Sequence, residues 1–488
     1  MKYVLHENYR LRGYERLPTG LFSTLTRRVT YLPQDLYRVL LRCNGAYDID
    51  LDGLSERELD FLHDLEDRGI VRPARFAETL LPEQVYRHYP AEYRYECHWS
   101  ITGCCNFQCR HCFMSAPEAK HGTPSWDQLI DVADQLAEYG VFNVGITGGE
   151  PLIRGDLLPL LDELKKRDIA VTTIYTNGWL MSKALLDALE ERRIRPAFQL
   201  SFDGIGQHDF LRGVDGAEGR TLEVLGLLRE RGYRVSVSMC LHRGNVGTIA
   251  ETVRLMGSLG VLSLKIAPMM ELGAWTNPEM RQLYLTEDEA LQALCDYIPQ
   301  YFEDDAPVDI MLGGCFMFRR GGKPWGIYNV RSCFVEEEAK MPSCGMLLKS
   351  FYVSAEGRVA PCMGMDDCTY AVNFPNLHER PLREILTDPA FTRLACATVK
   401  DVRDANPECR SCEYVDRCTG GCRNNVLIHS DDYYGIDKEL CRFFEGGWDK
   451  KVAAIAEPAY QAYRRRHPEP KYGKEAGQGG VDEAVDFC

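Results

Sequence analysis

The middle of the chain alternates short apolar runs with longer amphipathic segments. Between residues 97 and 275, six runs read as strands: HWSITG, FNVGITGG, VTTIYTNG, FQLSFDG, RVSVSMCLH and LSLKIAP. The segments between them repeat apolar residues at helical spacing, as in SWDQLIDVADQLAEYG, LLPLLDELKKRD, ALLDALEERR and RTLEVLGLLRERG. Strands that alternate with amphipathic helices form parallel βαβ units. The pattern therefore predicts an α/β fold, a partial (β/α)6 barrel whose functional loops lie at the carboxyl ends of the strands.

Residues 1–95 follow another pattern and contain no clustered cysteines. LFSTLTRRVTYL predicts a strand and QDLYRVLLRC predicts a helix. Ser55 and Glu58 have the spacing of a capping box, which opens a second helix, ERELDFLHDLEDRG. Gly69 ends that helix, and IVRPARF returns as a strand. Strands beside short helices in this order predict a winged-helix-like module.

The C-terminal third is dominated by cysteines, and its hydrophobic periodicity is weak. The final stretch, RRRHPEPKYGKEAGQGGVDEAVDFC, is polar and rich in glycine, which is typical of a disordered tail. We therefore expect four parts: the module over 1–95, the barrel over 96–310, a cysteine-rich domain over 311–445, and a C-terminal helix with a tail over 446–488.

Composition narrows the functions that this chain can have. No run of apolar residues is long enough to span a membrane, and the first residues lack the apolar core of a signal peptide, so we expect a cytoplasmic protein without a membrane partner. The net charge is −15 with no long basic stretch, which argues against a nucleic-acid partner. Twenty cysteines, many at short fixed spacings, indicate metal sites in a cytosolic protein.

One cysteine group follows the first predicted strand. Cys105, Cys109 and Cys112 have the spacing C-x3-C-x2-C, and starting at the adjacent Cys104 gives C-x4-C-x2-C. A loop that offers three thiolates to a four-iron cluster leaves one iron without a protein ligand. An open coordination position is where substrate or cofactor chemistry takes place.

Short polar groups end the following strands. Gly148 and Gly149 allow a close approach to the backbone, and the carboxylate of Glu150 can accept from an ammonium group. Ser201 and Asp203 suit ribose hydroxyls, and the nearby Arg212 suits a carboxylate. Together these six residues form one candidate site. On successive strand ends beside a three-cysteine loop, they describe a site for a zwitterionic nucleoside.

CNFQCRHCF, GGEP and SFDG, in this order and spacing, resemble the radical S-adenosylmethionine (radical SAM) superfamily over about 97–275. The resemblance implies that Cys105, Cys109 and Cys112 hold a [4Fe-4S] cluster whose free iron takes the amino and carboxylate groups of SAM. It places Phe113 near the adenine, Gly148, Gly149 and Glu150 at the methionine end, Ser201 and Asp203 at the ribose, and Arg212 at the carboxylate. Cys104 is then a bystander. The alternative is a zinc loop with one redundant cysteine.

The superfamily's chemistry implies a redox enzyme. The reduced cluster cleaves SAM to methionine and a 5′-deoxyadenosyl radical, which removes a hydrogen atom from an unactivated carbon. A flavodoxin or ferredoxin is the electron donor that the resemblance implies. The protein must orient the target and exclude water from the site.

Seven further cysteines resemble the SPASM extension of radical SAM enzymes. They are Cys344, Cys362, Cys409, Cys412, Cys418, Cys422 and Cys441. The resemblance implies two auxiliary [4Fe-4S] clusters, so three in all. One is bound by Cys344, Cys362 and Cys422, and the other by Cys409, Cys412, Cys418 and Cys441. For the fourth ligand of the first, Cys333 is favoured because it closes the shorter loop, Cys315 is the alternative, and an open site remains a third outcome.

Enzymes with this extension mostly modify peptides or proteins. The resemblance implies oxidative modification of a ribosomally made precursor peptide with a leader, by an intramolecular thioether or carbon–carbon crosslink. A sulfatase-type formylglycine maturase is an alternative, disfavoured because the Gln-Met-Asp triplet of that branch is absent. A non-catalytic zinc-binding interaction protein is the alternative of another class. No catalytic base is identified; Asp366 and Asp367 are candidates for it, but we expect them to be solvated loop carboxylates instead.

The N-terminal module is similar to the elements that peptide-modifying enzymes use to hold a leader peptide. On that interpretation an exposed strand edge takes the leader as an added strand. A plain structural cap over the barrel is the alternative. The sequence names neither the peptide, the bond formed nor the oligomeric state.

Overall fold

The computed structural model describes residues 1–15, 17–24, 29–89, 95–114, 116, 121–269, 272–320, 324–331 and 335–468. Its centre is a ten-stranded sheet in the order β15-β14-β13-β12-β11-β10-β9-β8-β16-β17. The strands are β8 (Glu96–Ser100), β9 (Asn143–Thr147), β10 (Ala170–Thr176), β11 (Ala197–Ser201), β12 (Val235–Leu241), β13 (Ser263–Pro268), β14 (Asp309–Leu312), β15 (Phe316–Phe318), β16 (Ser350–Val353) and β17 (Val359–Ala360). All neighbours from β8 to β14 pair in parallel. The α/β barrel-like fold predicted from the pattern is confirmed.

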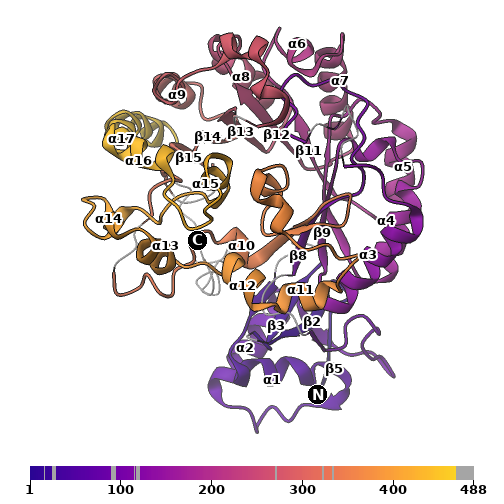
Figure 1. Ribbon diagram of the computed structural model, residues 1–488. Coiled ribbons are helices and arrows are strands. Elements are labelled where there is room, and N and C mark those ends of the chain that lie inside the picture. The colour runs from indigo at the N-terminus through magenta and orange to yellow at the C-terminus, as the bar shows by residue number, and fades with distance from the viewer. Residues whose placement is uncertain are drawn as a thin grey trace.

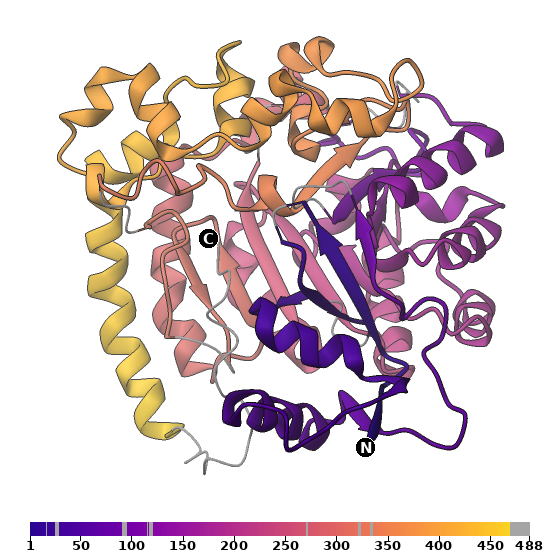
Figure 2. The ribbon, with the colours of Figure 1, turned by 90° about the horizontal axis from the view of Figure 1, so that it is seen from below.

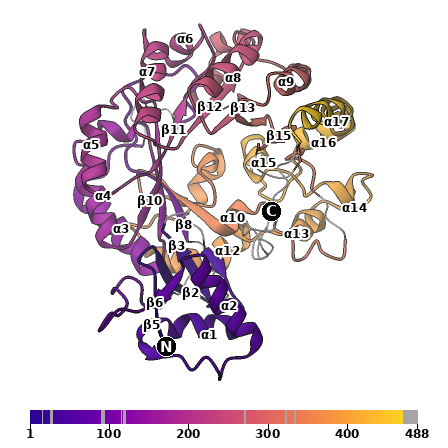
Figure 3. The same cartoon turned by 180° about the vertical axis from the view of Figure 1, so that it is seen from behind.

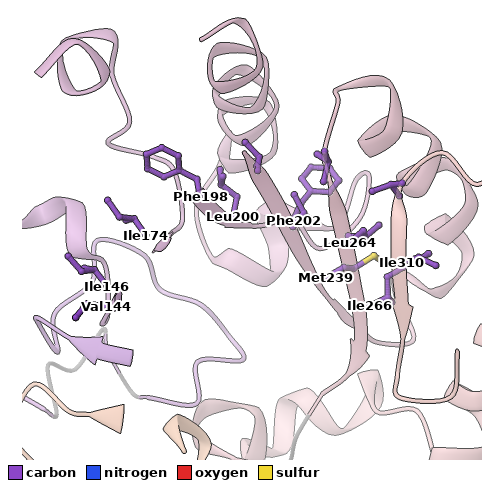
Figure 4. Packing of buried hydrophobic residues seen from close by; sticks show 14 of the residues in the cluster. Val144, Ile146, Ile174, Phe198, Leu200, Phe202, Met239, Leu264, Ile266 and Ile310 are labelled. Atoms are coloured by element: carbon purple, nitrogen blue, oxygen red, sulfur yellow. The ribbon is translucent and has the colours of Figure 1, made fainter. Parts of the chain in front are cut away.

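Helices line the outer side of this curved sheet (Figure 1). They are α3 (Trp126–Tyr139), α4 (Leu157–Lys166), α5 (Lys183–Glu191), α6 (His208–Arg212), α7 (Ala217–Glu230), α8 (Ile249–Ser258) and α9 (Glu287–Glu303). Strand residues alternate between the two faces. Ile146, Leu200 and Leu264 are among those turned toward the helices, where they form the main core (Figure 4). We call the opposite, inner face of the sheet the lumen face.

The cysteine-rich part adds strands to the same sheet, which the sequence pattern did not predict. β16 pairs in parallel with β8, although some 250 residues separate them, and β17 pairs antiparallel with β16. The remaining helices are α10 (Met346–Lys349), α11 (Leu382–Thr387), α12 (Pro389–Ala395), α13 (Val399–Ala405), α14 (Pro407–Arg410), α15 (Arg423–His429), α16 (Lys438–Glu445) and α17 (Trp448–Arg466). Figure 2 shows this orange and yellow segment along one end of the strands. α17 packs against α9.

The N-terminal module contains two small sheets and two helices. Its elements are β1 (Lys2–Leu5), β2 (Tyr9–Tyr14), β3 (Gly20–Ser23), β4 (Val29–Tyr31), α1 (Gln34–Arg42), β5 (Asn44–Asp48), α2 (Glu56–Asp67), β6 (Val71–Pro73) and β7 (Arg87–Tyr89). The sheet orders are β5-β1-β6 and β4-β3-β2-β7. Both bonds of the predicted Ser55 capping box are present. LFSTLTRRVTYL, however, contributes two antiparallel strands instead of one.

This module docks at the amino ends of the barrel strands (Figures 1 and 3). Phe142, which precedes β9, packs against Phe22 and Tyr14 of the module with ring centroids 4.4 and 6.1 Å apart. The buried Arg12 side chain pairs with Asp168, which precedes β10. The loops after β8 and its neighbours lie at the other end of the strands, so the module packs on the barrel at the end away from them, and its role as leader holder or plain structural cap stays a prediction.

The described part of the chain contains no helix that is long and apolar enough to cross a membrane. The predicted disordered tail begins close to Arg466 and falls mostly outside the described residues.

Candidate functional site

The loop after β8 brings three thiols together. Burial raises the pKa of the Cys105 thiol to about 12, and the neighbouring Cys109 and Cys112 add to the rise. Burial also raises the pKa of Cys109, an effect that the nearby Arg212 guanidinium opposes. Backbone N–H groups point at the sulfurs: Phe107 donates to Cys105 at 3.4 Å and Ala116 to Cys112 at 3.4 Å.

Such a set of thiols fits a bound iron–sulfur cluster. Because their pKa values are raised, the thiols of Cys105 and Cys109 remain protonated on their own. Coordination to a metal removes those protons, and N–H groups aimed at the sulfurs stabilise the resulting charge. The donors are all sulfur, which is the ligand type of such clusters. We therefore propose that this loop holds the cluster that opens onto SAM.

Cys104 is turned away from this set. Its thiol lies 3.1 Å from the Thr123 hydroxyl, and its carbonyl accepts from the Glu150 N–H at 2.9 Å. No interaction between this thiol and Cys105, Cys109 or Cys112 is present among the described contacts. This placement agrees with the prediction that Cys104 is a bystander.

The paired glycines support the loop from the next strand end. A side-chain carbon at Gly148 would lie 2.4 Å from the Thr102 carbonyl oxygen, and one at Gly149 would lie 2.1 Å from that of Cys104. Gly148 also has φ +147°, which larger side chains adopt rarely. Only glycines allow the strand end to pack so closely against the cysteine loop.

Glu150 is completely buried, and its carboxylate accepts hydrogen bonds from other residues of the protein. Its carboxylate accepts from the Leu152 N–H at 2.9 Å, the Thr176 hydroxyl at 2.7 Å and the Asn177 N–H at 2.7 Å. Burial raises its pKa to about 7 against these bonds. The side chain therefore links the ends of β9 and β10, and its predicted contact with the SAM amino group remains a prediction.

Asn177 is a site residue that sequence reasoning missed. Its side-chain amide donates to the Asn106 side chain at 2.9 Å and lies 3.9 Å from the Cys105 sulfur. The signal was available, because VTTIYTNG ends in a short polar group like the other strand ends. Asn177 holds the cysteine loop from the third strand.

α6 holds the loop from the other side. Arg212 donates from Nε to Asp203 Oδ2 at 2.7 Å, and its Nη1 lies 3.8 Å from the Cys109 sulfur. Asp203 is fully buried and also accepts from the Cys240 N–H at 3.1 Å. Burial raises the pKa of Asp203, but the Arg212 guanidinium, the hydrogen bond with His208 and the nearby imidazole of His111 together leave it below the usual value. The carboxylate faces Arg212 instead of open space, so any part in ribose binding would be indirect.

Ligand atoms of His111, Asp203 and Cys240 lie within 4.8 Å of one another. The Asp203 carboxylate is already neutralised by Arg212, so this group is a polar network under the cysteine loop. Ser201 ends β11 half-buried, one position before Phe202. The backbone of Phe113 contacts Gly273, and Ala274 N–H donates to the Cys112 carbonyl at 2.9 Å, so the segment after β13 completes the frame of the loop.

The C-terminal cysteines form two further sets. In the first, burial raises the pKa of Cys422 to about 12, and Cys362 and Cys344 add to the rise. In the second, burial raises the pKa of Cys418 to about 11 and of Cys441 to about 12; Cys409 adds to both, and Cys412 also acts on Cys418. These are the two interleaved sets that the SPASM resemblance implies. Their role as cluster ligands is a proposal, based on the same gathering of neighbouring thiols, the ligand type of iron–sulfur clusters.

Of the two candidates for a fourth ligand of the first set, Cys333 lies outside the described residues. Cys315 is fully buried, donates to the Leu312 carbonyl at 3.1 Å and shares a hydrogen bond with Cys295. This orientation disfavours Cys315. Cys368 packs in a separate apolar cluster and donates to the Met365 carbonyl at 3.1 Å.

The expectation that Asp366 and Asp367 are solvated is wrong. Both side chains are 5% exposed. Asp366 Oδ1 accepts from Arg358 at 2.8 Å, and Asp367 Oδ1 lies 3.2 Å from Nε2 of the buried His121. The latter pair joins the segment after the SAM-site cysteines to the cysteine-rich domain. Sequence reasoning missed it because the partners are 246 residues apart.

Comparisons with known proteins agree with this arrangement. Residues 99–256 match the model of the radical SAM superfamily, and residues 344–413 match SPASM, an iron–sulfur cluster-binding domain. PqqA peptide cyclase of Gluconobacter oxydans is 27% identical over 67% of this chain and 85% of its own length. AdoMet-dependent heme synthase of Methanosarcina barkeri is 25% identical over 69% and 93%. The subtilosin biosynthesis protein AlbA of Bacillus subtilis is 33% identical over 33% and 36%.

Among solved structures, Streptococcus suis SuiB bound to its precursor peptide SuiA has a similar fold. The TM-score is 0.61 at 18% identity, and the alignment covers 90% of this chain and 100% of SuiB. The structure of anSMEcpe with bound AdoMet has a TM-score of 0.55 at 16% identity and covers 76% of this chain and 98% of that one. The chain therefore contains a radical SAM domain followed by a SPASM iron–sulfur cluster-binding domain, and its relatives indicate an enzyme.

Proposed function

We propose that this enzyme oxidatively modifies a ribosomally made precursor peptide, forming an intramolecular thioether or carbon–carbon crosslink. The observation that carries the proposal is the second and third thiol sets beside the SAM-site loop, which cleavage of SAM alone does not require. The Lys265 ammonium on β13 lies near both the SAM-site region and the first C-terminal set, which supports our placing the two side by side. Although burial raises the pKa values of Cys240, under the SAM-site loop, and of Cys362, in the first C-terminal set, this ammonium opposes the rise at both.

Bound SAM and clusters supply a deoxyadenosyl radical and electron acceptors. The chain's own residues hold the loop, exclude water with the buried core and offer a polar lumen face to the peptide. We propose three four-iron clusters, with an external flavodoxin- or ferredoxin-type donor reducing the first. That arrangement corresponds to ~12 iron atoms per chain, a count that anaerobic purification and metal analysis measure.

The relatives support the peptide class. PqqA peptide cyclase, AlbA and SuiB are named for peptides or peptide products, whereas the heme synthase is not. The SuiB alignment leaves a tenth of this chain unmatched, which is less than the 95 residues of the N-terminal module. A fold shared with a peptide-bound structure therefore extends into that module. Neither the relatives nor the sequence favours a formylglycine maturase, and a non-catalytic zinc protein is incompatible with a radical SAM enzyme.

The decisive experiment incubates the anaerobic, iron-loaded enzyme with SAM, a reductant and the precursor peptide encoded beside its gene. We expect the peptide to lose two hydrogen atoms per crosslink, with 5′-deoxyadenosine formed alongside, as read by mass spectrometry. A sulfatase-derived peptide with Cys or Ser at the target position is the comparison substrate. Formylglycine on that peptide and no change in the precursor would contradict the proposal.

The N-terminal module is proposed to hold the leader. Among the described strands β5 is an edge strand that pairs with β1 alone, and Ala46, Tyr47 and Asp48 are exposed. Deleting the module would uncover Phe142 and the barrel core, so a point change is the cleaner test. Ala46→Pro places a ring on that edge and removes the N–H that donates to Asn44 Oδ1 at 2.9 Å, whereas Ala46→Ser keeps this N–H. Proline alone should weaken peptide binding in a fluorescence assay while SAM cleavage without peptide is unchanged; equal binding by both variants would assign the leader elsewhere.

A further inference from the structure

The lumen face carries a histidine and a tyrosine that the functions described above leave unused. His98 lies on β8 between the core residues Cys97 and Trp99, and Tyr175 lies on β10 beside the core residue Ile174, so both point to the lumen. The rings are 5.7 Å apart. They meet because Gly145 on β9 has no side chain: a carbon there would lie 3.2 Å from His98 Cδ2 and 3.3 Å from Tyr175 Cε2.

The polar atoms of both rings are available to a ligand. Within the described residues, neither His98 nor Tyr175 has a hydrogen bond or ion pair to another side chain or to the backbone. Other polar groups on the same face are paired, such as Gln199 with Ser238 at 2.8 Å and Ser236 with Ser263 at 2.8 Å. Half-buried polar groups without a protein partner are typical of a binding surface.

The ionisation of the two rings separates their roles. Burial lowers the pKa of His98, so the imidazole is neutral near pH 7 and can accept a proton. Burial, and then the Glu96 carboxylate, raises the pKa of Tyr175 to about 12, so the phenol stays protonated and can only donate at neutral pH. Burial also raises the pKa of Glu96, which lies one strand repeat farther from the cysteine loop.

We propose that His98, positioned against Tyr175 over Gly145, accepts the proton that the substrate peptide loses when its crosslink forms. The inference rests on the proposed function. The new bond joins the attacked carbon to a sulfur or carbon of a second side chain. The hydrogen atom of the attacked carbon goes to the deoxyadenosyl carbon. The second group loses its hydrogen as a proton, which goes to His98, and an electron, which goes to an auxiliary iron–sulfur cluster.

The test compares His98→Gln with His467→Gln, a control at the exposed end of α17. Both variants are assayed with SAM, reductant and the precursor peptide encoded beside the gene. A positioned base contributes roughly 10²–10⁴-fold, so His98→Gln should lower crosslinked product by at least about a hundredfold. Formation of 5′-deoxyadenosine should stay within about twofold, because the hydrogen-atom step does not use the base. The control should match wild type in both.

A pH profile adds a readout that a structural role would not change. Product per deoxyadenosine should fall in wild type as the pH drops below the imidazole pKa, and this dependence should disappear in His98→Gln. Four other titratable groups lie around the imidazole. Tyr175 on β10 is next to its ring, and Tyr352 on β16 is its partner in the strand register. Glu96 on the same strand acts on Tyr175, and Lys349 acts on Glu96. Tyr175→Phe, which keeps the ring, should retain the wild-type pH dependence.

Gly145→Ala covers the case in which His98→Gln loses iron or solubility. Its added carbon forces the rings apart, and product should fall while SAM cleavage persists. Normal product and an unchanged pH profile in His98→Gln, or in Gly145→Ala if the first variant does not fold, would overturn the assignment. If wild type cleaves SAM but leaves the peptide unchanged, the proposed function fails first, so the two failures are distinguishable.

Discussion

The SAM-site loop and the C-terminal thiol sets both bring cysteines together, but different kinds of backbone structure hold the cysteines in place. The loop gathers its thiols within eight residues and is supported by segments that follow β9, β10, β11 and β13, through Gly149, Asn177, Arg212 and Ala274. The C-terminal sets collect cysteines from residues 344 to 441, on short helices and turns. The first site is pre-arranged by the barrel, whereas the others form only when a long segment folds around them. Their sensitivity to substitution should differ accordingly.

The largest effect is expected in the loop itself. Replacing Cys105, Cys109 or Cys112 with Ala should abolish SAM cleavage, because a four-iron cluster with one open iron needs all three thiolates to hold it. Cys104→Ala is the matched control and should keep most activity, since its thiol contacts Thr123. The measurement is 5′-deoxyadenosine formed without peptide, together with iron content. An inactive Cys104 variant beside an active Cys105 variant would reverse the assignment of the loop.

The C-terminal sets should separate cleavage from product. Cys412→Ala or Cys418→Ala should leave reductive SAM cleavage measurable while crosslinked product falls below about a hundredth of wild type, because the electron acceptor is disturbed and the radical source is not. Product and deoxyadenosine are quantified in the same reaction, with solubility and iron content alongside. Full product formation by a soluble variant would show that the second set has no part in turnover.

A smaller effect is expected from the residues that frame the loop. Arg212→Ala removes the charged hydrogen bond that we predict to the SAM carboxylate, worth roughly 1.5–3 kcal/mol, so SAM affinity should fall about tenfold to a hundredfold. Asp203→Asn tests the indirect role: it keeps the shape but removes the charge that holds Arg212, and its effect should be in the same direction and no larger. Calorimetry with the iron-loaded enzyme measures both. Unchanged affinity in both variants would remove this pair from the SAM site.

The contrast between local and long-range contacts explains which features could be predicted from the sequence. The six barrel strands and their helices follow from local periodicity, and all six are present. The Ser55 capping box is likewise local and was predicted correctly. β16 is a four-residue strand whose position depends on pairing with β8 far away, so no local pattern marks it. The two strands of LFSTLTRRVTYL were missed for a related reason, since the largely polar residues between them leave little hydrophobic signal to separate one strand from two.

Site residues follow the same rule. The grouping of the SAM-site cysteines could be predicted from their spacing, because residues so close in sequence lie close in space in any fold. Burial of Asp366 and Asp367 could not be read from CMGMDDC, since their partners Arg358 and His121 arrive from other elements. His98 is similarly inconspicuous in ECHWS and gains its meaning only from the gap at Gly145 and the ring of Tyr175.

The smallest effect concerns the contact that joins the two regions, His121 with Asp367. A hydrogen bond to Asp367, above all, raises the pKa of His121. A group whose folded pKa is raised contributes stability that is complete below its unfolded pKa of about 6.5 and is lost as the pH rises through the folded value. A double-mutant cycle with His121→Ala and Asp367→Ala, measured by denaturant unfolding, should therefore give a coupling of about 1 kcal/mol at pH 6 that shrinks toward pH 9. A coupling that does not fall as the pH rises would mean that the imidazole is neutral in this contact, and the two regions would then be joined by packing and by the pairing of β16 with β8 instead.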